Sequence, residues 1–135
     1  MPDIIIIPPG GRLSLSPSSS AFAHGFGLFE TMRYADGRLY FWQDHWARLA
    51  KSARHFALTF PEQDEVLAAL RELAAAIPSG EATLKLSLVK EATESRLYVY
   101  SRPPIPAPEG RRLRLDATCP IARSSILAGH KTHNY

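Results

Sequence analysis

A single lysine near the carboxyl end of the chain, Lys131, is the residue whose type and setting could support covalent chemistry. It lies in the stretch LAGHKTHNY, residues 127–135, among small and polar side chains. A lysine amine attacks a carbonyl group only when it is neutral, and burial or nearby positive charge lowers its pKa toward that state. Position alone favours the other interpretation, an exposed lysine on a basic tail.

The remaining polar residues indicate neither a disulfide nor a metal site. Cys119 is the only cysteine, so no internal disulfide can form. The five histidines show none of the paired patterns that bind zinc on a helix, and we expect no metal. The one dense basic patch, EGRRLRLD at residues 109–116, is interpreted as a solvated strand face. Nucleic-acid binding through Arg111, Arg112 and Arg114 is the weaker alternative.

The length and composition are those of one globular domain. The chain has 135 residues, of which 45% are hydrophobic and 21% charged, and a net charge of +3. No apolar run approaches the roughly 20 residues needed to span a bilayer. The start, MPDIIIIPPGG, lacks the basic region and the longer apolar stretch of a signal peptide. We therefore expect a cytoplasmic protein without a membrane partner.

The first half of the chain predicts a strand, a hairpin and two helices. DIIII is a β-branched run that predicts a strand, and SLSPSSSA at residues 14–21 predicts a loop. Residues 28–34 alternate, and Asp36-Gly37 predicts a hairpin turn into a strand at 39–42. A helix over 43–58 would start at an Asp44 N-cap, and a second over 61–80 would hold Pro61 in its first turn. Their apolar stripes comprise Trp46, Leu49, Ala53 and Phe56, then Val66, Leu70, Leu73 and Ile77.

The second half predicts three more strands, at residues 82–90, 95–102 and 111–118. The last two are separated by a proline-rich connector. Antiparallel strands flanking two helices indicate an α+β domain over residues 1–118. Residues 121–135 have no regular period and are interpreted as a linker that runs away from this domain.

Three stretches in this order resemble the fold-type IV enzymes that use pyridoxal phosphate (PLP). They are HGFGLFETMRYADG, DHWARLAKSA and SSILAGHKTHNY. The family contains branched-chain and D-amino acid aminotransferases and 4-amino-4-deoxychorismate lyases. The resemblance implies the N-terminal α+β domain of this fold, a PLP cofactor, and a linker at 119–135 that begins a truncated C-terminal domain carrying Lys131.

The resemblance also implies roles for individual residues. Lys131 would form the Schiff base with PLP and then move protons. Arg48, in the family's HxxRL motif, would bind the cofactor phosphate, because a guanidinium is a forked donor for anions. The alternative for Arg48 is an exposed arginine paired with Asp44, worth only a few tenths of a kcal/mol. His45 is interpreted as a packing or capping residue. Tyr135 would contact the phenolic oxygen of the cofactor.

The resemblance further implies two residues for substrate recognition. Phe29 occupies the position at which the family places an aromatic residue facing the substrate. Lys90 lies near the position at which D-amino acid aminotransferases place an arginine for the substrate carboxylate. Core packing of Phe29 and a solvated strand-end Lys90 are the alternatives. Gly25 and Gly27 would let the backbone turn into the strand. Phe26 replaces the family's aspartate, a departure that bears on substrate recognition.

The resemblance implies an aminotransferase acting on amino acids, or a lyase that splits aminodeoxychorismate into pyruvate and 4-aminobenzoate. Thr132 and His133 after the lysine, in place of glycines, favour the lyase. Relatives are homodimers with a second domain, so we expect this chain alone to be inactive. The alternative is a non-catalytic, self-associating or regulatory domain.

Overall fold

A computed structural model describes residues 4–7, 16–91, 94–106, 110, 112, 114, 118 and 123–133. It contains one five-stranded antiparallel sheet of order β1-β5-β4-β2-β3 and three helices. The predicted α+β class is confirmed, with two long helices and one short one. The elements are β1 (Ile4–Ile7), α1 (Ser20–His24), β2 (Leu28–Ala35), β3 (Arg38–Leu39), α2 (Trp42–His55), α3 (Gln63–Ala75), β4 (Ala82–Lys90) and β5 (Ser95–Arg102).

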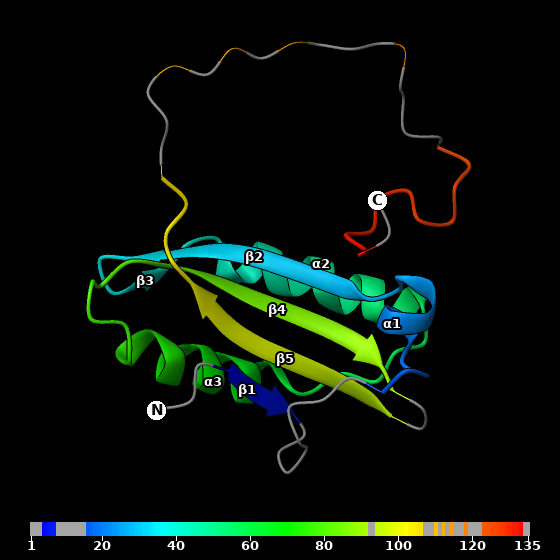
Figure 1. Ribbon diagram of the computed structural model, residues 1–135, viewed down its shortest axis with the longest axis horizontal. Helices are drawn as coiled ribbons and strands as arrows, with labels where there is room; N and C mark the ends of the chain where they lie inside the picture. Colours follow the sequence, from blue (N-terminus) through cyan, green and yellow to red (C-terminus); the bar gives the residue numbers. More distant parts are fainter. Residues whose placement is uncertain are drawn as a thin grey trace.

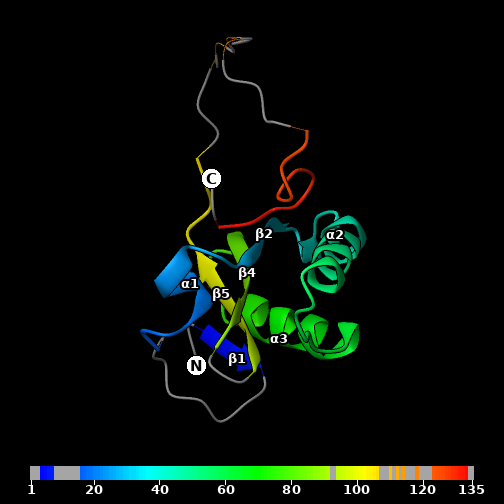
Figure 2. The same cartoon turned by 90° about the vertical axis from the view of Figure 1, so that its right-hand side faces the viewer.

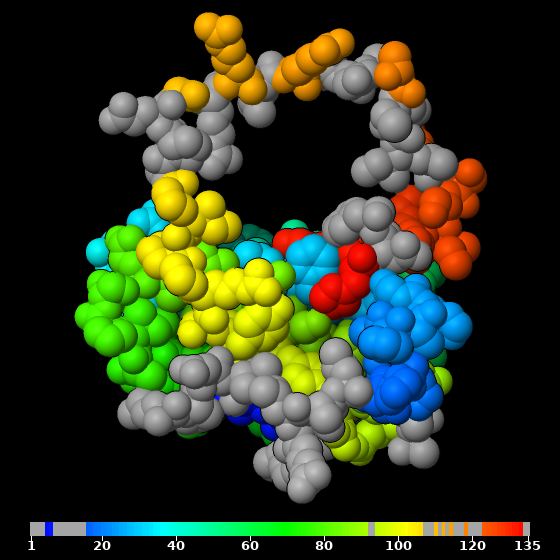
Figure 3. All heavy atoms as spheres, viewed as in Figure 1, coloured from blue at the N-terminus to red at the C-terminus, as the bar shows by residue number. Residues whose placement is uncertain are grey.

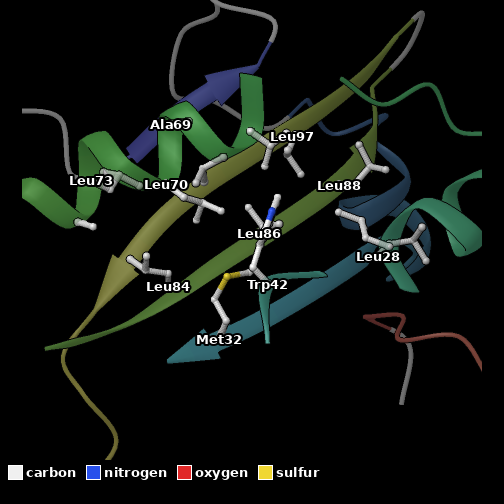
Figure 4. Close-up of a cluster of buried hydrophobic side chains, with 14 of the residues drawn as sticks. Leu28, Met32, Trp42, Ala69, Leu70, Leu73, Leu84, Leu86, Leu88 and Leu97 are labelled. Atoms are coloured by element: carbon white, nitrogen blue, oxygen red, sulfur yellow. The ribbon is translucent and has the colours of Figure 1, made fainter. Parts of the chain in front are cut away.

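The two long helices cover one face of the sheet, and no helix lies across the middle of the other face among the described residues (Figures 1 and 2). Helix α2 packs against β2 and α3 against β5. Strand β4 is central, and its alternate leucines, Leu84, Leu86 and Leu88, are fully buried against the helices. Figure 4 shows these leucines in one buried cluster that also contains Leu70 of α3 and Met32 of β2. We call the opposite side of the sheet the open face.

The hairpin forms at the predicted turn but its second strand is shorter than predicted. Asp36 and Gly37 both have positive φ, 53° and 72°, as a two-residue turn of this kind requires. β3 then ends at Leu39 and helix α2 begins at Trp42. The prediction of a strand over 39–42 is wrong because burial of the Trp42 side chain, beside Trp46, is achieved from the first turn of a helix.

Helix starts also differ from the predictions. Phe41, at φ 57°, precedes α2 without a side-chain cap, and Asp44 lies inside the first turn. Helix α3 begins after Glu62, so Pro61 precedes its first turn. The predicted loop at 14–21 gives way to α1, because the Ser19 hydroxyl accepts a hydrogen bond from the Phe22 N–H and caps it. None of the described helices is long and apolar enough to cross a membrane.

Few positions of the strand predicted at 111–118 lie among the described residues. Arg112 and Arg114 lie outside any strand, and the remaining positions of the predicted strand at 111–118, apart from Thr118, lie outside the described residues. Alternation predicts a strand only where another strand is available to pair with it.

Residues 123–133, which we call the terminal segment, return to the sheet (Figure 3). Thr132 forms an antiparallel bridge with Leu28 at the start of β2. The Phe29 N–H donates to the Lys131 carbonyl at 3.0 Å, and the His133 N–H donates to the Gly27 carbonyl at 2.8 Å. For residues 130–133 the prediction that the chain runs away from the domain is therefore wrong, because these residues lie against β2 and α2. β3 pairs only with Tyr34 and Ala35, so this end of β2 would otherwise be an unpaired edge.

Candidate active site at the edge of strand β2

Lys131 lies at the edge of β2, where it can reach both faces of the sheet. Its Nζ is 3.8 Å from Oε2 of Glu30, which faces the helices, and 5.0 Å from the ring centroid of Phe29, which faces the opposite way. The lysine side chain is 28% exposed. The backbone bonds of its own segment to β2 fix this position. Lys131 is thus a half-buried amine held beside an aromatic ring and a carboxylate.

Glu30 is the common interaction partner of the charged and polar side chains of the site. Its side chain is only 1% exposed and accepts from Arg48 Nε at 2.6 Å and from Arg48 Nη2 at 2.5 Å. His45 Nδ1 is 2.7 Å from Glu30 Oε2. A buried carboxylate is costly unless it is paired and hydrogen-bonded, and α2 supplies both partners three residues apart on one side of the helix. Glu30 therefore fixes the orientation of Arg48.

The sequence predictions did not name Glu30 as a site residue. A signal was present, because Glu30 alternates with Leu28 and Met32, which are both buried. A charged residue on the apolar side of a strand requires a partner of opposite charge. The HxxR spacing of α2 supplied one, but nothing in the two patterns states that they face each other.

Arg48 and Lys131, predicted separately, are brought together. Arg48 Nη2 and Lys131 Nζ lie within 2.5 and 3.8 Å of the same oxygen, Glu30 Oε2. The Arg48 side chain is 42% exposed, so a ligand can approach it. Among the ion pairs of the described residues, Arg48 pairs with Glu30 and not with Asp44. His45 bonds Glu30 and lies 3.1 Å from Arg48 Nη2, so it supports the arginine instead of capping α2.

The open face beside Phe29 is lined by cationic and aromatic groups. Lys85 Nζ lies over the rings of Phe29 and Tyr100, at 5.2 and 5.9 Å from their centroids. The His133 ring stacks on Phe29 at 5.1 Å and its Nε2 is 2.8 Å from Ser87 Oγ. Burial, followed by the charge of Lys85, lowers the pKa of His133 below its ordinary value. This surface favours an anionic group.

Two predicted residues have no described link to this cluster. Lys90 is exposed at the end of β4, and its backbone N–H donates to Ser20 Oγ at 3.1 Å. No hydrogen bond or ion pair of the Lys90 side chain occurs within the described part of the chain. Its substrate role stays a prediction. Tyr135 lies outside the described residues.

Gly27 and Gly25 serve different purposes. Gly25 has φ +60° and ends α1, a conformation that favours glycine. At Gly27 a Cβ atom would lie 2.6 Å from Cδ2 of His133 and 3.1 Å from the carbonyl oxygen of Leu88. Gly27 therefore allows the His133 ring to pack directly on the start of the strand.

Replacing Gly27 by alanine is expected to lower the free energy of unfolding by about 1–3 kcal/mol, because the methyl group overpacks against the backbone of β4. Urea denaturation measures this change. In the control Gly25→Ala the methyl group meets nothing within 4 Å, so the cost is that of backbone strain, about 1 kcal/mol. A Gly27→Ala variant as stable as the wild type would contradict the packing.

The residues of the cluster fit PLP. The cofactor needs an amine for its aldehyde and a donor for its phosphate, and the amine and the guanidinium lie close enough for one small ligand to contact both. The Phe29 ring adds an apolar wall. The described residues contain no group of three or more histidine, cysteine, aspartate or glutamate side chains that could hold a metal ion.

Comparison with known proteins agrees with this arrangement. The family model described as amino-transferase class IV matches residues 27–135. A putative 4-amino-4-deoxychorismate lyase shares 32% identity and a TM-score of 0.69, over 93% of this chain and 50% of that protein. A hypothetical aminotransferase from Mycobacterium tuberculosis, solved with α-ketoglutarate and PMP bound, shares 28% identity and a TM-score of 0.59, over 70% of this chain and 35% of that one.

A branched-chain amino acid aminotransferase from Escherichia coli shares the fold at 17% identity, with a TM-score of 0.64 over 74% of this chain and 39% of its own. No curated protein sequence matches this chain. The chain spans half or less of the length of these solved relatives. The family match and the shared fold together identify the chain as a member of the class IV aminotransferase family, in which it corresponds to the N-terminal domain of the fold.

Proposed function

We propose that this chain is the N-terminal part of a PLP-dependent enzyme, either an aminotransferase or an aminodeoxychorismate lyase, with Lys131 as the lysine that holds the cofactor. The observation that carries the proposal is the shared oxygen of Glu30, which brings the Lys131 amine and the Arg48 guanidinium together. A PLP-bound structure of the M. tuberculosis aminotransferase, 27% identical, supports PLP as the cofactor.

Each residue of the cluster then has one task. PLP, when bound, supplies an electron sink for the carbanion formed from the substrate. Lys131 holds the cofactor through its amine and, once released, carries protons to and from the substrate. Arg48 binds the phosphate, and Glu30 with His45 holds the guanidinium in place. Phe29 excludes water from one side of the site. Tyr135 remains our proposed contact to the phenolic oxygen.

The substrate side is proposed to recognise a carboxylate. Lys90 is the residue that the family resemblance suggests for this task. Lys85 is a second candidate, because it lies on the open face over Phe29, the ring that Lys131 also contacts. The similarity to the putative lyase, which extends over 93% of this chain, favours the lyase reaction over transamination. A homodimer in the cytoplasm is the assembly and location that we propose.

We expect the 135-residue chain alone to bind PLP weakly and to turn over little substrate. The relatives are about twice as long, and the partner of the pyridine nitrogen is expected in the additional part. An absorbance titration with PLP measures the affinity, and release of pyruvate from aminodeoxychorismate or amine transfer to 2-oxoglutarate measures turnover.

Tight PLP binding by this chain would contradict that expectation and leave the role of Lys131 standing. Complete absence of a PLP adduct at Lys131, even at high cofactor concentration, would contradict the proposed function itself. Together with self-association in sedimentation experiments, that absence would favour a non-catalytic domain.

A further inference from the structure

Two histidines flank Lys131 in the sequence and are anchored to opposite layers of the fold. His130 lies against α2, where its Nδ1 is 2.9 Å from the hydroxyl of the buried Ser52. Its ring stacks on His55 at 4.4 Å and meets the edge of Phe56 at 4.9 Å. His133 lies against the open face of the sheet, where it bonds Ser87 and stacks on Phe29.

The pairing with β2 explains why the two rings diverge. Successive side chains of an extended segment point to opposite sides. Lys131 and His133 therefore share one side, and both contact the Phe29 ring, at 5.0 and 5.1 Å. Thr132, which is 1% exposed, points to the other side. The terminal segment is thus fixed before and after the lysine.

Building on the proposed function, we propose that His130 and His133 are positioning residues that hold Lys131 between Glu30 and Phe29 only while both imidazole rings are neutral. Among the described residues, the hydrogen bonds of the two rings go to Ser52 and Ser87 and not to the amine. The two histidines act through the backbone of the terminal segment, whose bonds to Gly27 and Phe29 set where the lysine side chain begins.

The surroundings of both rings disfavour a proton. His130 faces His55 and Lys51 of α2, and His133 faces Lys85 of β4, with Lys131 over the same Phe29 ring. Glu30, the nearest acid to Lys131, is engaged on the helix side by Arg48 and His45.

These surroundings lower the pKa of both histidines. Burial makes the largest contribution at His130, followed by the charges of His55 and Lys51, and lowers its pKa from the ordinary value of 6.5. Burial and then Lys85 lower the pKa of His133.

Acid is expected to weaken the docking of the terminal segment. A histidine whose pKa is lowered by docking binds fewer protons when the segment is docked than when it is released. Docking is therefore at full strength above the ordinary histidine pKa of 6.5 and weakens as the pH falls below it. The terminal segment therefore holds Lys131 at the site at neutral pH, and it undocks from β2 in mildly acidic solution.

Hydrogen exchange of the 135-residue chain tests the pH dependence of docking without any cofactor. Between about pH 8 and about pH 5, after correction for the intrinsic exchange rate, we expect the amides of Phe29 and His133 to lose protection while the central β4 amides keep theirs. In His130→Asn/His133→Asn the protection of these amides is expected to be weaker and independent of pH. The control His24→Asn, an exposed histidine on α1, keeps the wild-type pH dependence.

A second readout connects the docking to Lys131. At neutral pH the double variant is expected to yield several-fold less borohydride-trapped PLP adduct at Lys131, with labelling of Lys51 unchanged. Protection that is independent of pH in the wild type, or equally pH-dependent in the double variant, would overturn the inference. A pH-dependent segment that never forms the adduct would instead refute the proposed function and leave the docking role standing.

Discussion

A chain in which Lys131 is replaced by methionine is expected to form no PLP adduct at this position and to lose the absorbance change that accompanies cofactor binding. Methionine keeps the length of the side chain but removes the amine, the group that attacks the aldehyde. Absorbance titration and mass spectrometry after borohydride reduction measure the two effects.

The fold is expected to survive this substitution. Glu30 keeps Arg48 and His45 as partners, and Lys131 is a partly exposed cation 3.8 Å away, so the free energy of unfolding should change by less than about 1 kcal/mol. Lys51→Met, at an exposed position of α2, is the matched control and should retain both signals. A Lys131→Met chain with an unchanged absorbance signal would contradict the assignment.

Breaking the buried ion pair of Glu30 and Arg48 is expected to have a large effect on stability. Arg48→Met is expected to lower the free energy of unfolding by about 3 kcal/mol, because it leaves a carboxylate that is 1% exposed without its main partner. Glu30→Gln should cost less, about 1–2 kcal/mol, since the partners that it leaves are partly exposed to water. Denaturant unfolding of each variant measures the difference.

The double variant Glu30→Gln/Arg48→Met makes this test sharper, because the costs of two residues in direct contact do not add. We expect it to be more stable than the sum of the single effects predicts. The pair Arg33–Glu81, at 3.5 Å with side chains 62% and 49% exposed, provides the control. Arg33→Met should change stability by less than about 1 kcal/mol. Additive costs at Glu30 and Arg48 would contradict a coupled buried pair.

The local elements of this fold could be predicted where the signal lies within a short stretch. Asp36-Gly37 fixes a hairpin because both residues tolerate positive φ. The alternating leucines of β4 and the apolar stripes of the two long helices directly specify one buried face. These patterns were enough to predict the α+β class, the two long helices and most of the strands.

Boundaries set by tertiary packing were not predictable in this way. Trp42 follows a strand pattern in the sequence, yet its burial against the core makes it the first residue of α2. The missed helix α1 depends on a cap from Ser19 in a serine-rich stretch that reads as a loop. Arg112 and Arg114 alternate with leucines as a strand would, but pairing partners are not encoded in alternation.

In the candidate site, too, local motifs could be predicted from the sequence, whereas contacts between distant residues could not. The motifs around Arg48 and Lys131 were readable one by one, whereas their meeting at Glu30 joins positions 18 and about 100 residues apart. The docking of the terminal segment depends on an unpaired edge of β2, which exists only once the sheet order is known. The roles of His130 and His133 follow from that docking and from no local pattern.

One amine of this chain, that of Lys131, is proposed to react with an aldehyde cofactor in preference to the other lysine amines. The chain has four lysines, Lys51, Lys85, Lys90 and Lys131, so they can be compared within one sample. The most direct measurement is peptide mapping by mass spectrometry after treatment with PLP and borohydride over a range of cofactor concentrations. We predict that Lys131 is labelled first and that, at each cofactor concentration below saturation, it is labelled to a greater extent than the other three lysines. Equal labelling of all four lysines, at every concentration, would contradict the claim.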